Sequence, residues 1–177
     1  MYLVDQFVEN PTGETYLALL DLLVLSPEYA PYNGLFESLE RKAENQDWQG
    51  VVDEFDDNQL AFLLSPAAHA IVGFAAEKLG ERERALMEAL FLSACLYCIF
   101  ECGDGTREKP YPVSIIHDET ILKKRLKFES TGQKLERDGD RYFDVFTDES
   151  GKQLFFDVTR PFSKLKGQFK DESDDSA

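Results

Sequence analysis

Three cysteines lie close together near the end of an apolar stretch, and they are the first residues whose types could do chemistry. Cys95 and Cys98 form a C-x-x-C pair, and Cys102 follows at helical spacing. A redox pair of this kind needs a helix N-terminus to lower the thiol pKa, whereas these residues fall late in a predicted helix. A structural zinc ion needs four ligands. We therefore predict a buried apolar stripe and no metal site.

A second group of polar residues follows this stretch. Asp104 and Thr106 belong to a Gly-Asp-Gly-Thr loop, and Tyr111 and His117 come soon after it. The loop follows a helix, so it lacks the helix N-terminus that a phosphate site uses. One interpretation is a loop that presents Asp104, Thr106, Tyr111 and His117 to a ligand. The other is a helix stop and turn, in which Asp104 bonds the local backbone.

The two histidines are weak candidates for catalysis. His117 precedes Asp118, and an imidazole beside a carboxylate can exchange protons near neutral pH. A hydrolytic triad would also need a nucleophile on a sharp turn, and the sequence has no G-x-S-x-G motif. His69 stands among apolar residues on a predicted helix. We assign no catalytic residue and no cofactor, and we favour an ordinary core or surface role for each histidine.

The charges divide the 177-residue chain unevenly. The net charge is −15, with −14 in residues 1–106, +3 in residues 107–170 and −4 in residues 171–177. So acidic a chain would repel nucleic acid and an anionic membrane surface. It would attract a basic protein, although solubility alone also explains the charge. The last seven residues offer almost nothing to bury, so we predict a disordered tail.

The compartment is predicted from what the sequence lacks. Residues 1–6 show neither a basic region nor the start of a long apolar run, so no export signal is visible. The apolar run between Glu88 and Glu101 has 12 residues, whereas a membrane span needs roughly 20. An odd number of cysteines, without an export signal, favours reduced thiols in the cytoplasm.

The elements that must position these groups are helical in the first half. Apolar spacing predicts helices over residues 15–25, 32–44, 48–55, 66–79 and 81–102. Asp47 and Ser65 are predicted caps, Pro66 suits a first helical position and Gly80 a left-handed helix end. Asn45 and Gly80 stand 35 residues apart, each between two predicted antiparallel helices. This period resembles tetratricopeptide helix pairs, and an ordinary helical bundle is the alternative.

The second half changes to strand patterns. We predict strands over residues 111–116, 141–147 and 154–158, a helix over residues 118–127 capped by Asp118, a hairpin turn at Asp138-Gly139 and a closing helix over residues 162–169. The predicted fold class is therefore α+β, with tetratricopeptide-like helical hairpins (residues 1–106) packed on a small antiparallel meander with short helices (residues 107–170).

Two motifs carry a family resemblance. Gly103-Asp104-Gly105-Thr106 and Asp157-Val158-Thr159-Arg160-Pro161-Phe162 resemble the start and the close of a C-terminal module in a family of uncharacterised bacterial proteins, a domain of unknown function. The resemblance covers roughly residues 28–169. It implies tetratricopeptide-like helices followed by a small α+β module. The family has no assigned activity, so the resemblance implies a fold and no function.

Three functions stay open at this stage. The first is a non-catalytic interaction module that binds a basic protein through an acidic concave face including Tyr32, Glu40 and His69. The second is a small-ligand receptor or hydrolase-like enzyme with a site where helices meet sheet. The third is a structural subunit of an assembly.

Overall fold

Helices make up the first part of the chain, as predicted. The computed structural model describes residues 2–165 and places seven helices before the first strand of this range. They are α1 (Tyr2–Glu9), α2 (Gly13–Leu25), α3 (Leu35–Glu44), α4 (Trp48–Asp57), α5 (Gln59–Phe62), α6 (Pro66–Leu79) and α7 (Arg82–Cys102). The tail of residues 171–177 and the end of the predicted closing helix lie outside the described residues, whereas residues 159–165 are helical.

The predicted helix signals act as expected. The Asp47 carboxylate accepts a hydrogen bond from the Gly50 N–H at 3.1 Å and starts α4. The Ser65 hydroxyl does the same for the Ala68 N–H at 3.1 Å, with Pro66 in the first turn of α6. Gly80, at φ +80°, ends α6 in the left-handed region that favours glycine. These caps fix where the helices begin and end.

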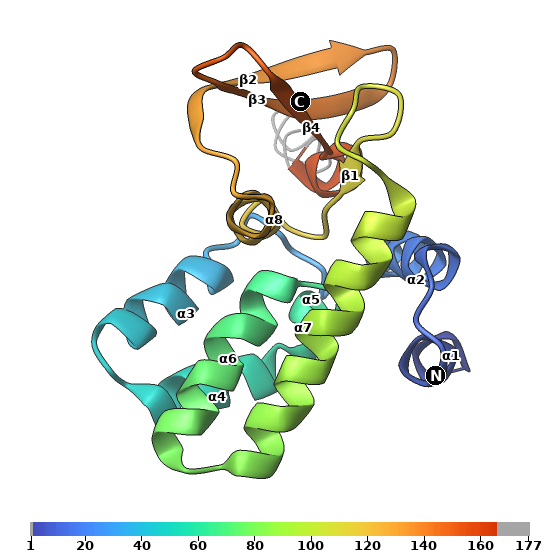
Figure 1. Cartoon of the computed structure of the whole chain (residues 1–177). Helices are drawn as coiled ribbons and strands as arrows, with labels where there is room; N and C mark the ends of the chain where they lie inside the picture. The colour runs from blue at the N-terminus through green and yellow to red at the C-terminus, as the bar shows by residue number, and fades with distance from the viewer. Residues whose placement is uncertain (1, 166–177) are drawn as a thin grey trace, which may run out of the picture.

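A four-stranded sheet forms the second half, and Figure 1 shows it above the helices with α8 between the two. Its elements are β1 (Tyr111–Pro112), α8 (Asp118–Leu126), β2 (Ser130–Asp138), β3 (Arg141–Asp148) and β4 (Gln153–Asp157). The strand order is β1-β4-β3-β2. The last three strands form an antiparallel meander, whereas β1, which the sequence placed in the meander, joins β4 in parallel.

Two features of the sheet differ from the sequence-based expectation. Strand β2 was not predicted, because nearly all of its side chains are exposed and no apolar alternation marks it. It exists because its backbone pairs with β3 from Ser130 to Asp138. Strand β1 is shorter than the predicted strand over residues 111–116. Pro112 has no N–H for a ladder, and the next residues turn toward Asp118.

The two halves share one core. A single cluster of buried side chains combines residues of α1, α2 and α7 with residues of β1, α8, β3 and β4. Cys95, Cys98 and Ile99 on the inner face of α7 belong to it, together with Phe156 of β4. A second cluster joins α3, α4 and α6. The predicted boundary near residue 106 is therefore a change of secondary structure within a continuous core.

Helix α7 is longer than the apolar run within it. Within the described chain it is the one helix long and apolar enough to cross a membrane, judged by length and composition. Its 21 residues extend the 12-residue run because Glu88 and Glu101 are tolerated inside the helix. One face packs on α6 and α2.

Candidate binding groove

An open cavity of about 280 Å³ lies where α3, α6 and α8 meet, and we call it the groove. Its apolar walls come from Phe36 on α3, Phe74 on α6 and Ile121 on α8. The other lining residues are Glu40, Ala43, Ala67, Ala70, Ile71, His117, Thr120 and Lys124. A hollow with apolar walls and a few polar groups is the usual form of a binding site.

Helix α3 contributes the acidic wall. Its apolar residues Phe36 and Leu39 are buried, while Glu37, Glu40 and Glu44 are exposed at helical spacing. Within the described residues Glu40 and Glu44 form no ion pair, whereas Glu37 Oε1 lies 3.6 Å from His117 Nε2. Glu40 therefore stays available to a cation in the groove, and Glu44 lies one turn further along α3.

Helix α6 contributes an aromatic floor. The Phe74 ring remains half-exposed, and Trp48 packs edge-on against it with ring centroids 5.5 Å apart. Lys78 Nζ lies 4.9 Å from the centroid of the same ring. The face of an aromatic ring attracts cations, and Lys78 already lies against that of Phe74.

Helix α8 is held in place by a buried carboxylate. Asp118 accepts hydrogen bonds from the Ser65 hydroxyl at 2.6 Å and the Ser114 hydroxyl at 2.8 Å, and from three backbone N–H groups of residues 67, 114 and 115. Burial raises the pKa of Asp118, and these hydrogen bonds act in the opposite direction. Asp118 is not the N-cap of α8, a position that His117 occupies. Its carboxylate instead ties the start of α8 to the start of α6.

The four predicted ligand-binding residues lie in three environments. His117 lines the groove and stacks on Phe36 with ring centroids 4.2 Å apart. Asp104 accepts hydrogen bonds from the Thr106 hydroxyl at 2.7 Å and the Thr106 N–H at 3.0 Å in an exposed turn. Tyr111 is buried in the core between Phe100 and Phe156. The loop thus has the local turn geometry that was the alternative to ligand binding, and His117 is the predicted residue that faces the groove.

The proposed acidic face is also divided. Glu40 lines the groove, but Tyr32 lines a different cavity beside the sheet, and His69 is buried. His69 is two residues from Ala67, which faces the groove, so the helical turn directs its side chain toward the opposite side of α6. The sequence placed His69 on α6 but did not determine which neighbour it faces.

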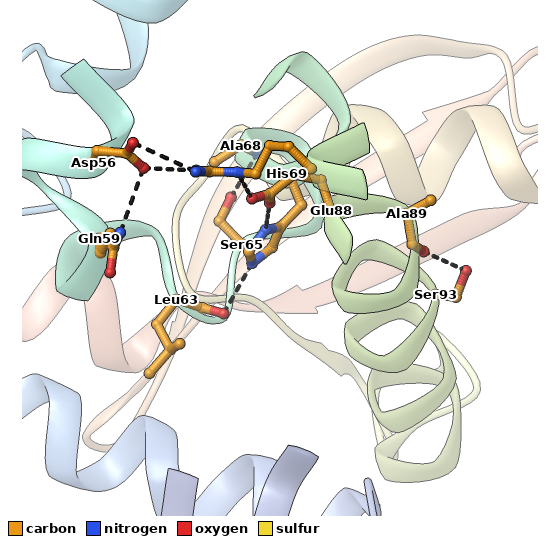
Figure 2. A network of polar contacts seen from close by, with 10 residues as sticks. Asp56, Gln59, Leu63, Ser65, Ala68, His69, Glu88, Ala89 and Ser93 are labelled. Carbon is orange, nitrogen blue, oxygen red and sulfur yellow. Dashed lines mark hydrogen bonds and ion pairs between the residues drawn. The ribbon is translucent and has the colours of Figure 1, made fainter. Parts of the chain in front are cut away.

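Figure 2 shows the buried polar network that His69 joins instead. His69 Nδ1 lies 2.6 Å from Glu88 Oε2, and its Nε2 lies 3.1 Å from the Leu63 carbonyl oxygen. Arg84 Nε donates to Glu88 Oε1 at 2.6 Å, and its NH2 group donates to Asp56 at 2.6 Å. The hydrogen bond from Arg84 lowers the pKa of Asp56. Both histidine nitrogens therefore have hydrogen-bond partners within the chain.

Glu119 is a buried carboxylate that sequence reasoning missed. Its Oε1 has no hydrogen-bond partner among the described residues. Burial raises its pKa to about 9, the charge of Asp144 adds to the rise, and Lys123 opposes it. Burial also raises the pKa of the nearby Tyr32 to about 12. An acid beside Asp118 at a helix start looks like an ordinary capping residue, so the sequence held no signal for it.

The cysteines behave as the predicted apolar stripe. Cys95 and Cys98 are buried in the shared core, and Cys102 is half-buried. Burial raises the pKa of the Cys98 thiol to about 12 and that of Cys102 to about 11. Since the thiolate is the reactive form, these thiols are poor nucleophiles near neutral pH.

Comparisons with protein-family models, with curated proteins and with solved structures gave no match for this chain. The geometry of the groove and the charges around it are therefore the basis for assigning a function.

Proposed function

We propose that this chain is a non-catalytic protein-interaction module that binds a basic segment of a partner protein in the groove. The observation that carries the proposal is the half-exposed Phe74 ring lying in a hollow whose α3 wall holds Glu40, which has no ion partner in the described chain. An apolar side chain of the partner would enter between Phe36, Phe74 and Ile121. Neighbouring Lys or Arg residues would meet α3 and Phe74.

The arrangement of the helices supports the same proposal. The pairs α3–α4 and α6–α7 each turn near one of the two residues, Asn45 and Gly80, that motivated the tetratricopeptide comparison. Stacked helix pairs present extended surfaces that hold peptides. We also propose a cytoplasmic location, because the three free thiols are compatible with a reducing compartment. The net charge of −15 disfavours nucleic acid as the partner.

A selection experiment tests the groove directly. A phage-displayed library of random short peptides is panned on the full chain, and the enriched peptides are measured by isothermal titration calorimetry. We expect sequences with one or two apolar residues flanked by Lys or Arg, and an affinity that falls with rising salt. Phe74→Ala should weaken binding at least tenfold. Leu135→Ala on β2, which removes a similarly exposed side chain far along the chain, should not. Enrichment of acidic peptides, or binding indifferent to Phe74, would contradict the proposal.

A small-ligand site at the helix–sheet junction is the second candidate. A cavity of about 390 Å³ there is lined by Tyr32, Gln133 and Asp144, among others. Glu119, with its unpartnered oxygen, interacts electrostatically with both Tyr32 and Asp144. Lys123 interacts with both carboxyl groups, and a ligand with an ammonium group would compete with it for Asp144. A thermal-shift screen of primary amines and polyamines checks this candidate, since a stabilising amine should lose its effect on an Asp144→Asn variant.

A further inference from the structure

The outer face of α7 carries a line of apolar side chains that no other part of the described chain covers. Leu86, Leu90 and Tyr97 are 68%, 62% and 54% exposed. With Ser93 they form what we call the α7 stripe. At 3.6 residues per turn these four positions fall within about 60° of arc around the helix. Only 22% of the most apolar 18-residue window of α7 is buried, which is far less than a core helix would show.

The spacing in the α7 stripe is that of a helix that pairs with another helix. Positions 86, 90, 93 and 97 alternate steps of four and three residues, the seam of a two-helix contact. The polar atoms on the stripe are satisfied within the chain. The Ser93 hydroxyl donates to the Ala89 carbonyl at 2.8 Å, and the Tyr97 hydroxyl donates to Glu101 at 2.7 Å. In Figure 2 the Ser93 side chain lies on the side of α7 away from His69 and Glu88.

The α7 stripe is also complementary to itself when it is reversed. The midpoint between Leu86 and Tyr97 is also the midpoint between Leu90 and Ser93, and between Arg82 and Glu101. An antiparallel copy therefore places Leu86 level with Tyr97 and Leu90 level with Ser93. The exposed Arg82 comes to the level of Glu101, on the opposite side of the contact. A two-fold interface requires this kind of self-matching surface.

We propose that the α7 stripe is a homodimer interface in which the α7 helices of two copies pack antiparallel. A membrane is the other occupant for such a face, but the ends of the stripe carry mixed charges, Arg82 beside Glu83 at one end and Glu101 at the other, where a membrane-surface helix has mainly Lys and Arg. The net charge of −15 further opposes an anionic bilayer. One helix from each copy makes a small interface, so the dimer should dissociate on dilution.

Sedimentation velocity over a range of concentrations tests the dimer. The full chain should shift from monomer to dimer as its concentration rises, and Leu86→Glu/Leu90→Glu should stay monomeric. Both side chains are exposed, so the variant should keep its circular dichroism spectrum. The matched control is Leu25→Glu on α2, which alters a side chain that is 79% exposed and should leave the dimer intact. A wild-type chain that stays monomeric at all concentrations, or a dimer lost equally with Leu25→Glu, would overturn the proposal.

Two further variants test the antiparallel direction. Glu83 of one copy lies near Glu101 of the other in this arrangement, so Glu83→Lys should tighten the dimer severalfold. In a mixture of Leu90→Cys and Ser93→Cys chains, oxidation should join the two different variants. Cross-links between identical Leu90→Cys chains alone would indicate parallel helices and overturn the pairing.

The effects of salt and of lipid vesicles distinguish a dimer through the α7 stripe from peptide binding in the groove and from membrane binding. Rising salt should strengthen the dimer, because it screens repulsion between two copies of charge −15 while the apolar contact persists. Peptide binding in the groove should weaken under the same conditions, so the two proposals fail independently. Binding of the monomer to neutral phosphatidylcholine vesicles that Leu86→Glu/Leu90→Glu abolishes would overturn the dimer in favour of a membrane.

Discussion

Helices α3 and α7 differ in which kind of side chain they bury and which they expose. Helix α3 buries Leu39 and exposes Glu40, as a surface helix of a soluble protein normally does. Helix α7 buries Glu88 in a network with His69 and exposes Leu90. Helix α3 thus has the ordinary pattern of a surface helix, whereas α7 leaves apolar side chains exposed on the face that we propose as a dimer interface.

Removing the buried charge of α7 should have the largest effect. Glu88→Ala leaves His69 and Arg84 without their shared carboxylate. Since breaking a buried ion pair leaves an uncompensated polar group, we expect a loss of about 3–5 kcal/mol in the free energy of unfolding. Glu40→Ala on α3 should leave that free energy nearly unchanged. Urea denaturation of both variants measures the difference. Equally small losses of unfolding free energy would show that burying Glu88 in α7 does not stabilise the fold.

Truncating one leucine on each helix should have the opposite result, with a large loss of unfolding free energy for α3 and a small one for α7. Leu39 is fully buried against the second core cluster, so Leu39→Ala on α3 should cost about 2–5 kcal/mol. Leu90→Ala on α7 should change the unfolding free energy by no more than about 0.5 kcal/mol when the protein is dilute enough to be monomeric. A large loss for Leu90→Ala in the monomer would mean that the α7 stripe packs within its own chain.

Glu119 on α8 sharpens the comparison, because this buried carboxylate lacks the partners that Glu88 has. Its pKa is raised from 4.5 to about 9 in the folded chain. Between these values the folded state holds a proton that the unfolded state releases, so stability falls as pH rises from 4.5 through about 9. Glu119→Gln should flatten this decline and stabilise the protein at pH 8 by roughly 1–3 kcal/mol.

Urea unfolding at pH 5, 7 and 9 checks the sign of this effect. The Glu129→Gln variant provides the control, because Glu129 is exposed. A wild-type stability that rises over this pH range, or a Glu119→Gln variant with an unchanged slope, would show that Glu119 is ionised in the fold.

Much of the fold could be predicted from local signals. Ser65, Pro66 and Gly80 delimit α6 through interactions within a few residues of each, so the sequence carries their effect directly. Strand β2 could not be predicted, because it depends on backbone pairing with β3 and exposes its side chains. Helix α1 was missed as well, although Phe7 is fully buried against α2.

The candidate site depended more on tertiary contacts. The buried cysteines and the turn at Asp104 followed from spacing and residue type. His69 and Glu119 did not, because helical spacing gives a direction only when the neighbouring elements are known. Helix α7 is apolar on nearly all sides in sequence, so no periodicity revealed which face would meet α6 and which would stay exposed.

The most direct test of the account is an NMR titration of the ¹⁵N-labelled full chain with a basic peptide enriched in the library selection. We predict shifts of amide signals along α3, α6 and α8 around Phe74 and Ile121, with signals of Arg82 to Tyr97 unchanged at a fixed protein concentration. Shifts centred on α7, or spread evenly over the acidic surface, would contradict the assignment of the groove as the partner-binding site.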